Sequence, residues 1–96
     1  YIVCKDKKEA RKISKHLLDK KLVACVNIFP IESMYWWDDK IEESKEVVVL
    51  AKTKEGNYKK IKQEVEKIHS YDVPAIIRLG CESNKDYSDW IDKVVS

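Results

Sequence analysis

The alternation of apolar and polar residues divides the chain into short strands and amphipathic helices. Residues 1–4 form a short apolar run that predicts a first strand. Asp6 then stands three residues before Glu9, a spacing typical of the capping box that opens a helix. The helix is supported by apolar residues that recur at helical spacing, namely Ala10, Ile13, Leu17 and Leu18.

The stretch from residue 22 to residue 51 predicts a long β-hairpin. Its first half is apolar on both sides of a period-two backbone, and its second half ends in the run 47–51, which is typical of a central strand. Asp38 and Asp39 lie between the halves, and aspartate tolerates the positive φ angles of a two-residue hairpin turn. Because both faces are apolar, we expect helices to cover one and a neighbouring subunit to cover the other.

The rest of the sequence predicts a second helix, a fourth strand and a terminal helix. The second helix is expected to begin near Glu55 and to end before Pro74, with Tyr58, Ile61, Val65 and Ile68 on its apolar side. Residues 75–79 are apolar enough for a strand. The terminal helix is expected to pack through Tyr87, Trp90, Ile91 and Val94.

The predicted order, βαββαβ followed by one helix, is that of a ferredoxin-like, split βαβ fold of the α+β class. Right-handed crossovers place the strands in the order 4-1-3-2, all antiparallel. The end of the first strand then lies beside the residues that follow the second helix. We therefore expect one edge of the sheet to gather Cys4, His69, Tyr71 and Pro74.

Composition indicates a single soluble domain that comprises residues 1–96. Hydrophobic residues make up 44% of the chain, and no apolar run approaches the roughly 18 residues of a membrane span, so no membrane partner is expected. Nineteen basic and 17 acidic residues are interspersed, which argues against nucleic acid. The chain has an odd number of cysteines, and they lie far apart in the sequence, at Cys4, Cys25 and Cys81. This pattern suits reduced thiols in a cytoplasm better than disulfides.

Cys4 and His69 are the candidate metal ligands. A thiolate and an imidazole suit copper or zinc, and the softness of the thiolate favours Cu(I). Two ligands are too few for a closed site, and no CxxC or HxxxH spacing supports them. The alternative is structural, with Cys4 as a small buried side chain and His69 as a cation at a helix C-terminus.

The other polar and aromatic candidates are better explained by structure. His16 is expected to be a partly exposed helix residue, and Cys25 a buried thiol. Trp36 and Trp37 point to opposite faces of a strand, so we expect them to pack within or between subunits. An RNA-recognition module would need aromatic residues on its central strands, and an acylphosphatase-like hydrolase an arginine in a phosphate loop; neither is present. No enzymatic role is therefore expected.

Several segments together resemble the divalent-cation tolerance (CutA) family. They are KKLVACVN at 20–27, YWWDDKIE at 35–42, the strand 46–53, HSYDVP at 69–74, and the aromatic residues of the terminal helix. The resemblance runs in order over essentially the whole chain. It implies a PII-like homotrimer in the cytoplasm that is linked to copper tolerance and divalent metal binding, with no organic cofactor.

The resemblance also implies the metal ligands. The family's copper ligands are a cysteine that ends the first strand and histidines before a Tyr-x-x-Pro turn, which correspond here to Cys4 and His69. Some members have two adjacent histidines, and this chain has Ile68 at the position of the first of them. A third ligand is therefore expected from water, a counter-ligand or an adjacent subunit. It also departs from the family pattern at Asp39 and Ala75. The alternative function is a PII-like small-ligand sensor or protein scaffold with incidental metal binding.

Overall fold

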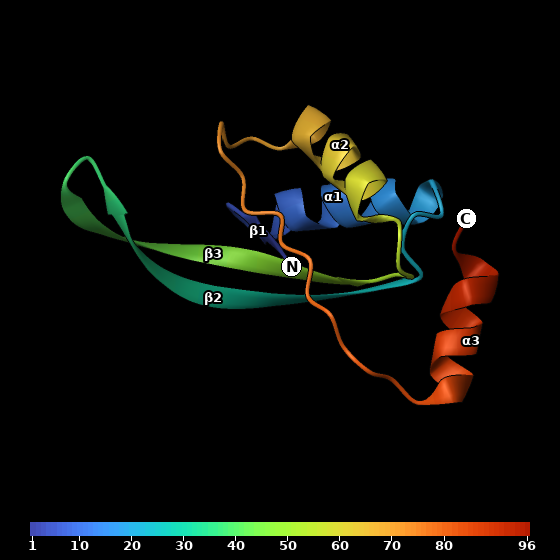
Figure 1. Cartoon of the computed structure of the whole chain (residues 1–96). Coiled ribbons are helices and arrows are strands. Elements are labelled where there is room, and N and C mark those ends of the chain that lie inside the picture. The colour runs from blue at the N-terminus through green and yellow to red at the C-terminus, as the bar shows by residue number, and fades with distance from the viewer.

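Six regular elements follow one another along the chain, and the computed structural model describes residues 1–96. They are β1 (Ile2–Cys4), α1 (Lys7–Asp19), β2 (Cys25–Trp37), β3 (Lys40–Lys52), α2 (Tyr58–Ile68) and α3 (Lys85–Val94). The strands form one antiparallel sheet in the order β1-β3-β2, and α1 and α2 lie over one of its faces (Figure 1). This arrangement confirms the predicted α+β class. None of the helices is long and apolar enough to cross a membrane.

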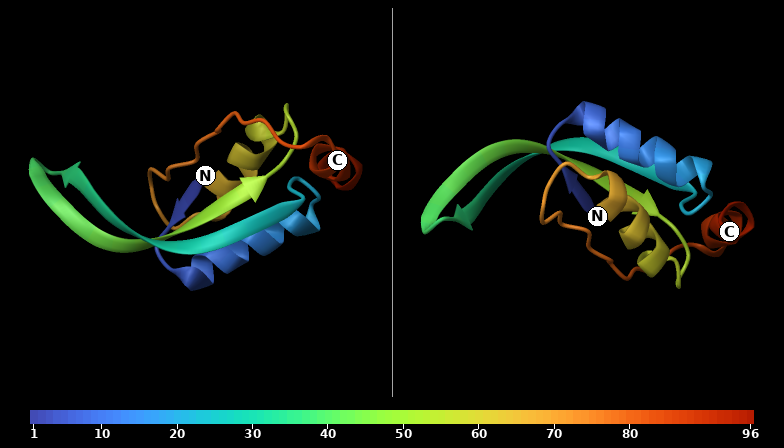
Figure 2. Two further views of the ribbon diagram at one scale, coloured as in Figure 1. Left: turned by 90° about the horizontal axis from the view of Figure 1, so that it is seen from below. Right: turned by 90° about the horizontal axis from the view of Figure 1, so that it is seen from above.

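The hairpin of β2 and β3 is the longest feature of the molecule. Its strands pair without interruption from Cys25 opposite Lys52 to Trp37 opposite Lys40. The helices cover only the half nearest β1, and residues 32–45 project beyond them as an arm, which Figure 2 shows from both sides. The arm gives the molecule a longest extent of 45 Å, against 26 and 21 Å in the other directions.

The turn at the end of the arm has the predicted conformation. Asp38 has a φ of 49° and Asp39 a φ of 62°, so both residues are left-handed. Two successive left-handed residues form a type I′ turn, whose twist matches that of the flanking strands. Two aspartates therefore occupy positions where glycine or asparagine is the commoner choice.

The predicted fourth strand is reduced to a single bridge. Ile76 forms an isolated antiparallel bridge with Ile2, and the N–H of Val3 donates to the carbonyl of Ala75 over 3.2 Å. The segment therefore lies beside β1, as the order 4-1-3-2 requires. Ile77 also exchanges two hydrogen bonds with Tyr1, each of 2.9 Å, and no backbone pairing with the first strand extends beyond it. The prediction of a strand over residues 75–79 is therefore wrong in length.

The hydrophobic core lies between the sheet and the two helices that cover it. Each helix buries the middle of the apolar stripe predicted for it, whereas Tyr58 and Ile68 are only partly buried and Leu18 is 38% exposed. The core comprises ten buried residues, namely Ile2, Cys4, Ala10, Ile13, Leu17, Leu22, Val23, Val49, Ile61 and Val65.

The chain between α1 and β2 differs from the prediction. The strand begins at Cys25, not at residue 22, and Lys21 has a left-handed φ of 55° that ends the helix region. Leu22 and Val23 are buried in the core although they lie outside the strand. An apolar loop that packs inward produces the same sequence pattern as a strand that is buried on both faces, which is why the hairpin was predicted to start too early.

The terminal helix α3 lies at the end of the sheet, apart from α1 and α2 (Figure 1). It is attached through Val95, which is buried, and through the N–H of Ser96, which donates to the carbonyl of Lys21 over 2.9 Å. Of its predicted inner stripe only Ile91 is buried, and Trp90 is 43% exposed. The apolar side of α3 is therefore only partly covered within the chain.

Candidate metal site

Three metal-ligating side chains from three elements meet where β1 ends. Cys4 is the last residue of β1, Glu9 lies in the first turn of α1, and His69 caps the end of α2. The Cys4 sulfur, a Glu9 carboxylate oxygen and a His69 ring nitrogen all lie within 4.8 Å of one another. We call these residues the donor cluster. The structure thus brings together the two predicted residues and adds Glu9, which was not predicted as a ligand.

Glu9 joins the start of α1 to the segment that follows α2. Its Oε1 accepts a hydrogen bond from the N–H of Lys5 over 3.0 Å, and its Oε2 accepts one from the N–H of Ser70 over 2.9 Å. Burial alone would raise the pKa of the Glu9 carboxyl, but these hydrogen bonds lower it. Glu9 is therefore a buried carboxylate that is held at both oxygens.

The position of Glu9 has a local cause in the sequence. Asp6 caps α1, with its Oδ1 accepting from the N–H of Glu9 over 2.8 Å, as the capping box predicted. In that motif the side chain of the third helical residue folds back towards the residues before the helix. Here those residues follow Cys4 directly, so the capping signal already placed a carboxylate near the thiol.

The ring of His69 has a backbone partner at each nitrogen. Its Nε2 lies 2.8 Å from the carbonyl oxygen of Val3, and its Nδ1 lies 3.0 Å from the amide nitrogen of Tyr71. A carbonyl accepts and an amide donates, so these partners assign a neutral ring with the proton on Nε2. The side chain is completely buried. This differs from the helix-terminal cation considered from the sequence, and a bound metal ion would replace one of the two hydrogen bonds.

The Cys4 thiol is fully buried at the bottom of the cluster. Burial, followed by the negative charges of Glu9, Asp6 and Glu46, raises its pKa to about 12. The thiol is therefore protonated at neutral pH. Because a metal ion binds the thiolate, coordination at Cys4 releases a proton.

A second buried contact supports the His69 side of the cluster. The Tyr71 hydroxyl donates to Oε2 of Glu46 over 2.7 Å, and burial together with this hydrogen bond raises the pKa of Tyr71. The Tyr71 and His69 rings lie 4.9 Å apart between centroids. Tyr71 therefore holds the segment after α2 against β3.

The chemistry of the donor cluster fits an ion of the copper and zinc group. Sulfur, nitrogen and carboxylate oxygen are all zinc ligands, with bond lengths that place donors of one ion roughly 3.3–3.8 Å apart. The spacing in the cluster is wider, with Nε2 of His69 at 4.0 Å from Oε1 of Glu9. The side chains therefore have to move together slightly and exchange hydrogen bonds in order to bind.

The remaining sequence candidates lie outside the cluster. His16 is partly exposed, as predicted, and its Nε2 lies 3.0 Å from Oε1 of Glu64. Cys25 is half-buried and Cys81 is exposed, both as free thiols. Trp36 is 73% exposed, so it does not pack within this chain.

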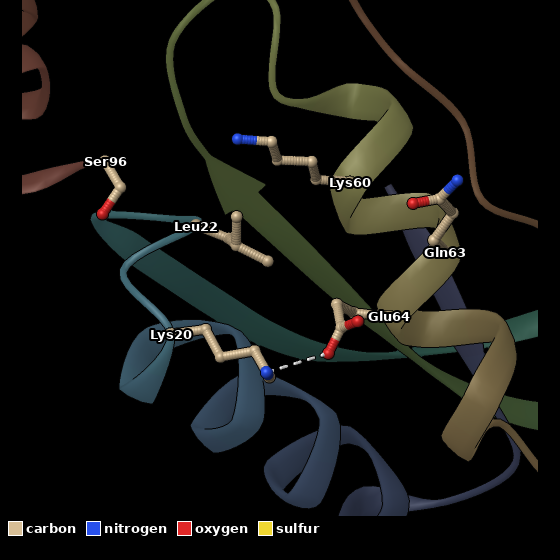
Figure 3. A pocket seen from close by; sticks show the side chains of 6 residues that line it. All are labelled: Lys20, Leu22, Lys60, Gln63, Glu64 and Ser96. Atoms are coloured by element: carbon tan, nitrogen blue, oxygen red, sulfur yellow. Dashed lines mark ion pairs between the residues drawn. The ribbon is translucent and has the colours of Figure 1, made fainter.

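A hollow of about 360 Å³ lies between the end of α1 and α2 (Figure 3). Lys20 points across it to Glu64, whose Oε1 lies 3.3 Å from the ammonium nitrogen. Hydrogen bonds from Lys67 and His16, with Lys20 nearby, lower the pKa of Glu64 to about 2. The lining thus includes one ion pair, Lys20 with Glu64, and it contains no residue of the donor cluster.

Comparison with known proteins places the whole chain in one family. The family described as CutA1 divalent ion tolerance protein matches residues 1–94. The divalent-cation tolerance protein CutA of Archaeoglobus fulgidus is 44% identical over 99% of this chain and 94% of its own length. The CutA protein of Thermococcus kodakarensis is 40% identical over 99% of this chain and 92% of its own length.

Solved structures agree with the sequence comparison. The crystal structure of CutA1 from Pyrococcus horikoshii has a TM-score of 0.94 and 38% identity, covering 99% of this chain and 94% of that one. The Archaeoglobus fulgidus structure, described as a periplasmic divalent cation tolerance protein, has a TM-score of 0.96 and 43% identity, with the same coverage. The resemblance inferred from the sequence is therefore confirmed, and the chain belongs to the CutA family of divalent-cation tolerance proteins.

Proposed function

We propose that this chain is a homotrimeric, cytoplasmic divalent-cation tolerance protein that binds copper or another divalent metal ion through Cys4, Glu9 and His69. The convergence of three buried donor atoms of three kinds in a CutA-family chain supports the proposal. Glu9 takes the place of the third ligand that Ile68 cannot supply. A bound ion would link the ends of β1 and α2 to the start of α1.

Binding has a clear chemical cost at this site. The ion displaces the proton of the Cys4 thiol, whose pKa is about 12, and one hydrogen bond of the His69 ring. Metal affinity is then linked to pH and is lower than at a site whose ligands are already free. The site therefore suits an ion that is bound at raised concentration, as tolerance to a metal requires.

The homotrimer is supported by the uncovered arm. The outer strand of the sheet is β2, and large apolar side chains are exposed along the part of the hairpin beyond the helices. Exposed apolar patches of this kind mark surfaces that other chains cover. The exposed residues of the arm are Met34, Tyr35, Trp36, Trp37 and Ile41.

The cytoplasmic location is supported by three free cysteines, one of which, Cys81, is exposed. An exposed thiol persists in a reducing compartment and is oxidised outside it. We propose no catalytic role, because Cys4 and His69 are completely buried and present no surface to a substrate. Fractionation of the native cells, with detection of the protein in cytoplasm and cell envelope, tests the location.

Calorimetric titration of the metal-free chain tests metal binding. Copper or zinc should bind with proton release, and Cys4→Ser and His69→Ala should each weaken binding about tenfold or more. Cys25→Ser and Cys81→Ser are the matched controls and should leave the affinity unchanged. Binding that survives the Cys4→Ser, His69→Ala double replacement would contradict the proposal.

The hydrogen bonding of the cluster supports the alternative in which metal binding is incidental. Both oxygens of Glu9 and both nitrogens of His69 already have partners in the chain, so the cluster is stable without a metal ion. The chain would then act as a PII-like sensor of a small anion or as a protein scaffold. Calorimetric titration of the metal-free chain with ATP in place of metal separates the two functions. Heat of binding with ATP, and none with metal ions, would favour the sensor.

A further inference from the structure

We infer that Glu9 biases the site towards divalent ions, Zn(II) among them, relative to Cu(I). The inference rests on the proposed metal binding and goes beyond it by assigning a selectivity residue. It also revises the expectation from the Cys4 and His69 pair alone, in which the soft thiolate favours Cu(I). Glu9 changes both the charge and the hardness of the ligand set.

The charge of the buried cluster favours a divalent ion. A Cys4 thiolate and a Glu9 carboxylate carry two negative charges, which a divalent ion neutralises. The metal-free cluster, with a protonated Cys4 and an ionised Glu9, already carries one negative charge. Cu(I) in place of the thiol proton leaves that charge unchanged, in a place where Cys4 and His69 are fully buried and Glu9 is 7% exposed. The attraction between this charge and the second positive charge of a divalent ion is strong in such surroundings, and this favours Zn(II).

No cationic side chain supplies the missing compensation. Lysines form ion pairs with Glu64 and Asp89, and none pairs with an acid of the cluster. The one ion-pair contact of Glu9 is with His69, which is itself a donor. The next nearest acids, Asp6 and Glu46, add negative charge. The second positive charge of a divalent ion is therefore the one that neutralises the cluster.

The hardness of the ligands acts in the same direction. Carboxylate oxygen is an established zinc ligand, whereas Cu(I) is selected by thiolate and thioether sulfur. Without the carboxylate, Cu(I) would retain two suitable donors, Cys4 and His69. Zn(II) would lose one of three, so the loss of Glu9 weakens zinc binding more than Cu(I) binding.

The carboxylate of Glu9 is held in place for this role. The N–H groups of Lys5 and Ser70 bind its two oxygens, and the cap at Asp6 fixes the turn of α1 that carries it. Metal-bound carboxylates are usually oriented by such outer hydrogen bonds. The Glu9 side chain is therefore already held at the cluster before an ion binds.

The inference is tested by letting the metal-free chain compete with a chromophoric chelator for the metal ion. Zn(II) and Cu(I) are titrated separately, without oxygen and with a reductant present. We expect Glu9→Gln to lower Zn(II) affinity about tenfold or more and Cu(I) affinity by less than about threefold. Glu64→Gln is the control, because Glu64 is a largely buried carboxylate in the hollow between α1 and α2, which contains no residue of the donor cluster. It should leave the ratio of the two affinities unchanged.

A spectroscopic measurement on the unchanged chain covers the case in which Glu9→Gln does not fold. The Glu9 carboxyl carbon should shift in the ¹³C NMR spectrum when Zn(II) is added, and should shift less with Cu(I). An equal loss of both affinities in Glu9→Gln, or a carboxyl carbon that does not respond to Zn(II), overturns the inference alone. Failure of both ions to bind, or binding that survives replacement of Cys4 and His69, overturns the proposed function as well.

Discussion

The Nε2 of His69 lies 2.8 Å from the carbonyl oxygen of Val3, so a residue at the end of α2 is fastened to the first strand across 66 positions of sequence. The other ring nitrogen accepts the N–H of Tyr71. In the metal-free chain the ring therefore acts as a bridge between β1 and the segment after α2. A metal ion competes with this bridge, so the stability of the fold and metal affinity are opposed at His69.

Replacing His69 should destabilise the metal-free protein. His69→Ala leaves the Val3 carbonyl and the Tyr71 amide without partners and creates a cavity, so we expect a loss of about 2–4 kcal/mol in the free energy of unfolding. Denaturant unfolding at fixed protomer concentration measures it. His16→Ala, on the partly exposed face of α1, is the control and should lose less than about 1 kcal/mol. Equal losses would contradict the bridging role.

Removing the Tyr71 hydroxyl should also lower stability. Tyr71→Phe leaves the buried Glu46 carboxylate without its donor at 2.7 Å, and we expect a loss of about 1–3 kcal/mol. Thermal unfolding at neutral pH measures the effect. Tyr35→Phe is the matched control, because its hydroxyl contacts only Ser44 on the exposed arm. A Tyr71→Phe protein as stable as the parent would show that the contact with β3 is unimportant.

Stability should fall with acid at Glu64. The pKa of Glu64 is lowered from 4.5 to about 2, so this carboxylate stabilises the fold above pH 4.5 and ceases to do so as the pH falls through about 2. Urea unfolding of Glu64→Gln should show reduced stability at neutral pH and convergence with the parent near pH 2. The exposed Glu66→Gln is the control. A difference that stays constant over this pH range would contradict the assignment.

The hairpin turn should be improved by glycine. Asp39 has a φ of 62°, which glycine adopts without strain, so Asp39→Gly should stabilise the protein by up to about 1 kcal/mol. Gly56→Ala provides a test in the opposite direction, because Gly56 has a φ of 93° and an added Cβ meets no atom within 4 Å. Thermal unfolding should show a gain for the first variant and a loss for the second. A loss for Asp39→Gly would contradict this explanation.

The sequence predicted what depends on local periodicity and turn chemistry. The helix stripes around Ile13 and Val65, the cap at Asp6 and the left-handed turn at Asp39 all follow from neighbouring residues, and each is present. The positions of Cys4 and His69 followed from topology. Once the strand order is known, the end of the first strand and the end of the second helix have to meet.

Features that depend on distant partners were not predictable in the same way. The capping signal at Asp6 places Glu9 near Cys4, but the contact of Glu9 with the N–H of Ser70, 61 residues away, depends on the packing of α1 beside the end of α2. The burial of Leu22 outside a strand depends on the packing of the α1 to β2 loop. The segment at Ile76 pairs with the first strand only as far as Ile77, and the apolar side of α3 is only partly covered within a single chain.

The most direct test of metal binding is a crystal structure of the chain soaked in zinc, with anomalous data on both sides of the zinc absorption edge. We predict one peak within bonding distance of the Cys4 sulfur, a Glu9 carboxylate oxygen and a His69 nitrogen, with one hydrogen bond of the His69 ring lost. Crystals in which the cluster keeps its present hydrogen bonds, while zinc binds only at the exposed Cys81 or nowhere, would contradict the account.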